Sequence, residues 1–124
     1  MSEITTIFIV EDNKNIREIY KRLLDFFGFE VCGIAYDGNE AVKMFKSFNP
    51  KPDIILMDYR MPEKNGLQAT REILQIDPDT KIIFGSADTT VKEESFALGV
   101  VGFLEKPFTS QSLLNCINKI QDLN

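Results

Sequence analysis

The chain has 124 residues, 44% of them hydrophobic and 27% charged, and this composition excludes an intrinsically disordered or a fibrous protein. The length suits one domain covering residues 1–124, and no apolar run approaches the ~20 residues of a membrane span, so we expect a cytoplasmic protein without membrane insertion. Because 19 acidic residues outweigh 14 basic ones, the net charge of −5 disfavours binding to the phosphate backbone of nucleic acids.

Short apolar runs rich in β-branched residues alternate with segments of helical spacing along the chain. The run at 54–57 is apolar at every position, which is typical of a central strand that is buried on both faces. Such alternation indicates a parallel sheet covered by helices on both faces. In chain order, the predicted strands are residues 4–10, 29–35, 53–57, 81–84 and 101–104.

Helices are predicted between these strands from apolar periodicity and from capping residues. The first, at 13–27, is expected to bury a stripe of side chains and to end before Gly28. The second follows the turn at 37–39 and stops before Asn49. The others are predicted at 66–76, at 89–98 and from Thr109 or Ser110 onward. The stripe on the first helix consists of Ile16, Ile19, Tyr20, Leu23, Phe26 and Phe27.

Histidine is absent from the sequence, and only two cysteines are present. Cys32 and Cys116 lie far apart in apolar surroundings without a CxxC spacing, which predicts two buried free thiols and neither a disulfide nor a zinc site. Without histidine the chain lacks the commonest general base and zinc ligand. Its chemistry must therefore rest on carboxylates, hydroxyls and lysines.

Polar side chains follow four of the predicted strands, at the point where each strand ends. They are Glu11 and Asp12 after the first strand, Asp58 after the third, Ser86 after the fourth and Lys106 after the fifth. The carboxyl ends of parallel strands meet at one edge of the sheet, where ligands of such sheets bind. Exposed strand ends often carry a polar residue, but a set of three acids, a hydroxyl and an ammonium indicates one site.

The charges of this set indicate its chemistry. Two carboxylates about 4 Å apart repel each other by roughly 4 kcal/mol at an effective dielectric of 20, so three acids together require a cation. Oxygen ligands select Mg²⁺ or Mn²⁺, and Lys106 and Ser86 could then contact further phosphoryl oxygens. Asp58 ends the central strand and is therefore the predicted acceptor of a phosphoryl group.

At these residues the sequence resembles the receiver domain of two-component response regulators, of which the single-domain chemotaxis regulator is the simplest form. The resemblance extends over nearly the whole chain. It implies an α/β, flavodoxin-like (βα)5 fold, a doubly wound parallel sheet with strand order 2-1-3-4-5, and it leads us to expect no output domain. The motifs that carry it are Glu11-Asp12, Asp58 with Met61-Pro62 and Asn65-Gly66, Ser86-Ala87, and Lys106-Pro107-Phe108.

The resemblance also implies roles for residues around the phosphoacceptor Asp58. Asp12 and Asp58 would bind Mg²⁺ directly, Glu11 would bind it through water, and the backbone carbonyl of Arg60 would be a further ligand. Arg60 and Asp88 flank the route of the hydrolytic water in this family. Because their charges are opposite, we expect the two side chains to pair and to slow dephosphorylation.

Three further residues correspond to the switch of this family. Lys106 would bind the phosphoryl group and precede a cis peptide bond to Pro107, while the Ser86 hydroxyl would turn toward that group. Phe103 matches the switch aromatic but lacks the hydroxyl of the commoner tyrosine, so its switching should depend on burial of the ring.

The resemblance implies a signalling protein and not an enzyme that turns over external substrates. The phosphodonor would be a histidine kinase or histidine phosphotransfer protein, with acetyl phosphate as a small substitute. A downstream target protein would bind the surface formed by the helix at 89–98, the strand at 101–104 and the last helix. The sequence leaves open whether the signal belongs to chemotaxis or a phosphorelay, and whether the chain stays monomeric or dimerises when phosphorylated.

Three other functions fit the sequence less well. A small Mg²⁺-dependent phosphohydrolase is disfavoured because Arg60 stands where the haloacid-dehalogenase pattern has an aspartate. A flavodoxin-like cofactor binder is disfavoured because the loop after the first strand has acids where a phosphate cradle needs glycine, serine or threonine. A scaffold that acts independently of phosphorylation would not need the complete set of acids, hydroxyl and lysine.

Overall fold

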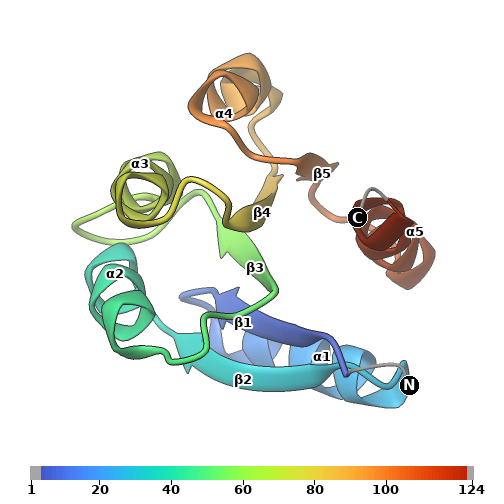
Figure 1. Cartoon of the computed structure of the whole chain (residues 1–124). Coiled ribbons are helices and arrows are strands. Elements are labelled where there is room, and N and C mark those ends of the chain that lie inside the picture. The colour runs from blue at the N-terminus through green and yellow to red at the C-terminus, as the bar shows by residue number, and fades with distance from the viewer. Residues whose placement is uncertain (1–3, 123–124) are drawn as a thin grey trace.

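Five parallel strands form one sheet in the order β2-β1-β3-β4-β5 in the computed structural model, which describes residues 4–122 (Figure 1). This order confirms the flavodoxin-like topology. The central strand β3 is buried at every position, as its uninterrupted apolar sequence predicts. The strands are β1 (Thr6–Val10), β2 (Glu30–Ala35), β3 (Ile54–Asp58), β4 (Lys81–Ser86) and β5 (Gly102–Glu105).

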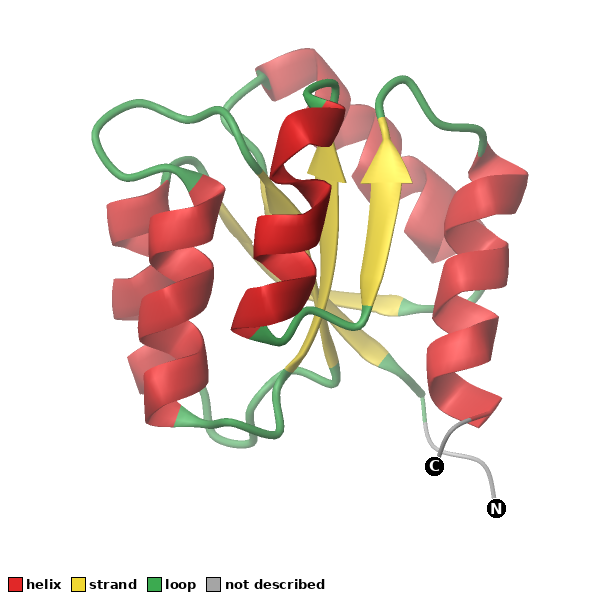
Figure 2. Ribbon diagram, turned by 90° about the horizontal axis from the view of Figure 1, so that it is seen from above, coloured by secondary structure: helices red, strands yellow, loops and turns green. Residues whose placement is uncertain are grey.

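Helices cover both faces of this sheet (Figures 1 and 2). On one face α1 (Lys14–Phe26) and α5 (Ser110–Asp122) enclose a hydrophobic core with the sheet. On the other face lies a second core under α2 (Gly38–Ser47), α3 (Gly66–Ile76) and the segment formed by η1 (Thr89–Val91) and α4 (Lys92–Leu98). The helices therefore cover the faces of the sheet but not the two edges at which the strands begin and end. At one of these edges the carboxyl ends of the strands open toward solvent.

Side-chain caps explain where several helices begin. Asn13, Asp37 and Asn65 each accept a hydrogen bond from a backbone N–H in the first turn of α1, α2 and α3. Asn65 and Gln68 form a reciprocal capping box, which anchors α3 directly behind the loop that follows β3. The predicted stop of α1 at Gly28 is confirmed, because Gly28 has a φ of +88° that favours glycine.

The predicted stripe on α1 is wrong in part. Tyr20 and Leu24 are the buried residues of this helix, whereas Ile19 and Phe26 are 61% and 83% exposed. Successive residues on a helix are about 100° apart, so a stripe of six apolar residues extends past the narrow face that contacts the sheet. Ile19 and Phe26 lie on the flank of that face.

Two smaller predictions also need correction. The helix expected at 89–98 begins as the 3₁₀ turn η1, because Asp88 accepts a hydrogen bond from Thr90 N–H, and only Lys92–Leu98 is α-helical. Cys32 and Cys116 are free thiols as predicted, but both are half-buried. Cys32 is part of the edge strand β2, and Cys116 lies on α5 against the other edge strand, β5. Within residues 4–122, no helix has both the length and the apolar character that crossing a membrane requires.

Candidate functional site

The three predicted acids meet at the carboxyl edge of the sheet. β1 and β3 are neighbours with Val10 opposite Met57, so Glu11 and Asp12 emerge beside Asp58. One carboxylate oxygen from each acid lies within 4.8 Å of the other two. Glu11 is 1% exposed and Asp58 is 7% exposed, whereas Asp12 faces solvent. The cluster therefore has a buried floor and one open side.

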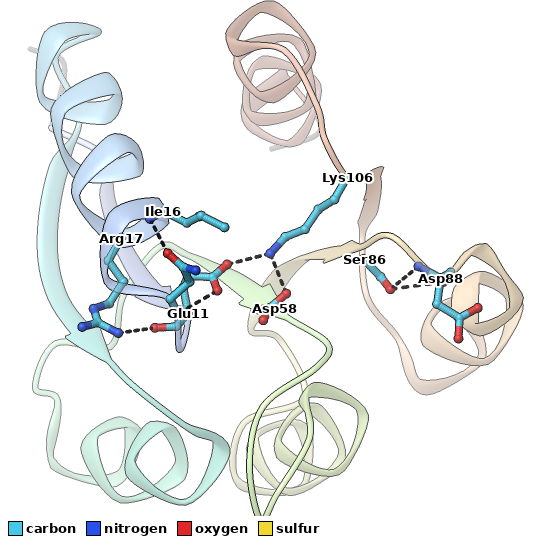
Figure 3. A network of polar contacts seen from close by, with 8 residues as sticks. Glu11, Ile16, Arg17, Asp58, Ser86, Asp88 and Lys106 are labelled. Carbon is cyan, nitrogen blue, oxygen red and sulfur yellow. Dashed lines mark hydrogen bonds and ion pairs between the residues drawn. The ribbon is translucent and has the colours of Figure 1, made fainter.

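Lys106 reaches this cluster from the end of β5, on the far side of β4 (Figure 3). Its Nζ lies 2.6 Å from Glu11 Oε1 and 2.7 Å from Asp58 Oδ1. The sequence predicts that a dication compensates the acids, with the lysine as a second positive charge. In the structure the Lys106 ammonium itself bridges two of the three acids, because its four-carbon chain spans β4.

The Lys106 side chain passes Gly85 of β4 on its way to the acids. A Cβ atom at Gly85 would lie 3.7 Å from Lys106 Cε and 3.7 Å from the Phe108 ring. The lysine side chain thus runs past β4 at a distance that would leave room for a methyl group at Gly85. The sequence showed a glycine before Ser86 but not that a lysine passes over it.

The loop after β1 is held by its own polar contacts. Glu11 Oε2 accepts a hydrogen bond from Asn13 N–H, so both oxygens of this buried carboxylate have partners. The Arg17 guanidinium donates to the carbonyl oxygens of Glu11 and Asp12 at 3.1 and 2.8 Å. Arg17 was not among the predicted site residues, because a basic residue in the first turns of an amphipathic helix usually points into solvent.

The surroundings of Asp58 and Lys106 shift the pKa values of both side chains. Burial raises the pKa of Asp58 to about 6, with Lys106 opposing the rise and Glu11 and Asp12 adding to it. For Lys106, burial disfavours the charged form, but the contacts with Asp58 and Glu11 outweigh it and raise its pKa above the ordinary value. The ammonium therefore stays charged, and the cluster retains an excess of negative charge that a divalent cation could offset.

The raised pKa of Asp58 predicts a pH dependence of stability. Its folded-state pKa of about 6 exceeds the ordinary pKa of 3.8, so its stabilising contribution is complete below the lower pKa and disappears as the pH rises through the higher one. In metal-free buffer, we expect the unfolding free energy of the wild type, relative to Asp58→Asn, to fall by about 2 kcal/mol between about pH 4.5 and about pH 7.5. Urea denaturation of both proteins measures this; a constant difference would contradict the shift.

Ser86 and Asp88 form a second group of polar contacts beside the acids (Figure 3). The Ser86 hydroxyl accepts a hydrogen bond from Asp88 N–H at 2.9 Å and donates to the Asp88 carbonyl at 3.2 Å. It is buried and held by its own loop, without a hydrogen bond to Asp58. The Asp88 carboxylate accepts hydrogen bonds from Thr90, which lower its pKa, and pairs with Arg60 at 3.3 Å. The expected Arg60–Asp88 pair is present; its effect on dephosphorylation stays a prediction.

Phe103, the predicted switch aromatic, lies on β5 opposite Phe84 of β4. Its half-buried ring stacks on Phe84 with ring centres 6.2 Å apart, and the Lys92 ammonium lies 5.9 Å from its centre. The Lys106–Pro107 peptide bond is cis, as expected from the resemblance, and Asn49–Pro50 is a second cis bond that no motif predicted.

Comparison with known proteins decides the family. The model of the response regulator receiver domain matches residues 7–118, which is most of the chain. This chain belongs to the response regulator receiver family.

Relatives of this receiver agree in sequence and in fold. It is similar to the chemotaxis protein CheY of Thermotoga maritima, with 39% identity over 116 residues, covering 92% of this chain and 95% of that protein. The structure of a CheX–CheY–BeF3–Mg complex from Borrelia burgdorferi shares the fold, with a TM-score of 0.91 at 24% identity, covering 94% of this chain and 89% of that one.

A further solved relative has a metal at its site. It is the receiver domain of a sensor histidine kinase from Pseudomonas aeruginosa, with a magnesium ion coordinated in the active site cleft. Its TM-score is 0.85 at 29% identity, covering 96% of this chain and 99% of that one. In the receiver described here, the donor set of Glu11, Asp12 and Asp58 consists of oxygens alone and has an open side at Asp12, which fits Mg²⁺.

Proposed function

We propose that this receiver accepts a phosphoryl group on Asp58 and passes on the signal by binding another protein. The observation that carries the proposal is the buried Asp58 carboxylate at the end of the central strand, 2.7 Å from the Lys106 ammonium and within 4.8 Å of two further acids. The open side of the site lets a phosphoryl group reach the carboxylate. The ammonium beside the carboxylate can then contact the negatively charged phosphoryl oxygens.

The transfer forms one bond and breaks one. An Asp58 oxygen attacks phosphorus, the P–N bond of a phosphohistidine breaks, and the leaving imidazole takes a proton from solvent. With acetyl phosphate, a P–O bond breaks and acetate leaves. Lys106 contacts a phosphoryl oxygen as charge develops there.

Glu11, Asp12 and Asp58 would hold Mg²⁺ in this proposal, Glu11 through water, with the backbone carbonyl of Arg60 as a further ligand. The metal would neutralise phosphoryl oxygens during transfer. The all-oxygen donor set and the magnesium in the related Pseudomonas receiver support Mg²⁺; Mn²⁺ prefers the same ligands.

The deciding experiment is incubation with Mg²⁺ and acetyl phosphate, followed by mass spectrometry of the intact protein. The wild type is expected to gain the mass of one phosphoryl group, and Asp58→Asn is expected to gain none. Asp25→Asn is the control, because Asp25 is an exposed acid on α1 whose carboxylate pairs with Lys21 at the surface. Phosphoryl gain by Asp58→Asn, or none by the wild type, would contradict the proposal.

A target protein would recognise the phosphorylated receiver through the surface formed by α4, β5 and α5. Phosphorylation offers Ser86 a charged acceptor in place of the Asp88 backbone, and turning of this hydroxyl would free space for Phe103. The surface formed by α4, β5 and α5 carries the exposed apolar residues Phe96 and Val101, which suits a target protein. A histidine kinase or histidine phosphotransfer protein is the proposed donor.

Arg60 and Asp88 are proposed to lengthen the lifetime of the phosphoryl group. Arg60 lies two residues after Asp58 and Asp88 two residues after Ser86, so their ion pair would restrict the approach of water to phosphorus. The Arg60 side chain is largely exposed and that of Asp88 partly so, and we expect Arg60→Ala and Asp88→Ala each to speed dephosphorylation by only about two- to fivefold. Release of phosphate from the purified phosphorylated proteins measures this rate, and two unchanged lifetimes would disprove the role.

The same pair argues against a phosphohydrolase. In that function, the residue two positions after the nucleophile would be an acid that exchanges protons with the leaving group. Arg60 occupies this position, and its side chain points to Asp88 and solvent. We therefore propose a phosphoacceptor and not an enzyme for external substrates.

A further inference from the structure

Tyr20 lies beside Lys106, although its sequence position suggested only a core-facing residue of α1. Its side chain is 9% exposed. Its ring stacks on Phe108, with ring centres 5.5 Å apart and planes inclined by 17°. Tyr20, Lys106 and Phe108 line the same apolar cavity of about 280 Å³, between α1 and the segment that follows β5. The phenol is thus fixed in place by its helix and by the stacked ring.

Tyr20 carries a neutral hydroxyl and lines the same cavity as Lys106. Burial raises the pKa of Tyr20 to about 12, and the charge of Lys106 is the strongest influence in the opposite direction. The phenol therefore stays protonated at neutral pH, and its oxygen can accept a hydrogen bond from an ammonium.

The contacts of Lys106 differ in how long they can last during phosphoryl transfer. An ammonium has three N–H donors, and Glu11 and Asp58 accept from it in the structure. Under the proposed function, Asp58 becomes an acyl phosphate and Glu11 turns to the metal, so both acceptors are withdrawn. Neither event removes Tyr20, which lines the same cavity as Lys106 and offers a hydroxyl acceptor.

We propose that Tyr20 is a positioning residue, whose hydroxyl holds the Lys106 ammonium toward the phosphoryl oxygens. The inference rests on the proposed function, because it assigns Tyr20 a task only where a phosphoryl group meets Lys106. It concerns a residue on α1 that is not part of the acid, hydroxyl and lysine set.

Tyr20→Phe tests this inference, since it removes the hydroxyl and keeps the ring that stacks on Phe108. The probe is BeF3⁻, a phosphoryl analogue, titrated into Mg²⁺-saturated protein and followed by NMR. We expect Tyr20→Phe to bind BeF3⁻ about three- to tenfold more weakly than the wild type, the loss typical of one hydrogen bond. Mg²⁺ binding without BeF3⁻ should change by less than about twofold. Tyr36→Phe deletes the same group from an exposed tyrosine and should bind like the wild type.

A double-mutant cycle separates positioning from a general effect on structure. In a Lys106→Met background, Tyr20→Phe should have no further effect on BeF3⁻ binding, because the residue through which it acts is absent. A purely structural loss would weaken binding equally in both backgrounds and would overturn the inference. Equal binding by wild type and Tyr20→Phe would overturn the inference alone. A wild type that binds no BeF3⁻ in Mg²⁺ would overturn the proposed function and this inference with it.

Discussion

Replacing Lys106 with methionine is expected to lower the free energy of unfolding by about 3 kcal/mol in metal-free buffer. Methionine retains the length of the side chain but not its charge, so Glu11 and Asp58 lose the ammonium that lies 2.6 and 2.7 Å from them. Both acids are buried, and an unpaired buried carboxylate is costly. Protonation of Asp58 limits the loss, because its pKa is already raised to about 6 and would rise further.

Urea denaturation in EDTA at neutral pH measures this loss, with Lys21→Met as the control. Lys21 pairs with Asp25 at 3.0 Å on the exposed side of α1, and such a pair contributes less than about 0.5 kcal/mol. Adding Mg²⁺ should restore part of the stability of Lys106→Met, since the metal would offset the same acids. Equal unfolding free energies for Lys106→Met and the wild type would show that the ammonium does not compensate the acids.

Gly66→Ala is the second substitution with a large expected effect. A Cβ atom at Gly66 would lie 2.1 Å from the carbonyl oxygen of Asp58 and 3.0 Å from Tyr59 Cα. Both are backbone atoms and cannot rotate away, and Gly66 N–H donates a 2.8 Å hydrogen bond to the Tyr59 carbonyl. The loop after β3 would have to move, which we expect to cost about 2 to 3 kcal/mol of stability.

The displaced loop follows Asp58 directly and the clash is with the Asp58 carbonyl oxygen, so Gly66→Ala should also accept the phosphoryl group at least about tenfold more slowly. Thermal unfolding and the rate of phosphorylation by acetyl phosphate measure the two effects. Gly85→Ala is the control for stability, because its Cβ would meet its neighbours at 3.7 Å, an ordinary contact. It should change the unfolding free energy by less than about 1 kcal/mol. A Gly66→Ala protein as stable as Gly85→Ala would contradict the predicted clash.

The sheet and the acid cluster could be predicted because their signals are local. Each strand is a short apolar run, and Glu11, Asp12 and Asp58 follow two of these runs directly. Because the strands are parallel, their carboxyl ends lie at one edge of the sheet. Since β1 and β3 are neighbours in the strand order, the acids that follow them form a cluster. The end of β4 was placed two residues too early, at 84. Gly85 and Ser86 continue the strand through pairing with Leu104 and Glu105, which lie far along the chain.

The sequence alone determined which residues gather at the edge and that oxygen ligands and a lysine would meet there, since both follow from residue type and from strand ends. Only the tertiary structure decided the contacts among them. The lysine spans β4 over a glycine to bridge two acids, and the Ser86 hydroxyl bonds to its own loop. Tyr20, from a helix on one face of the sheet, lies beside Lys106. These contacts join residues remote in sequence, and their distances depend on how the strands and helices pack.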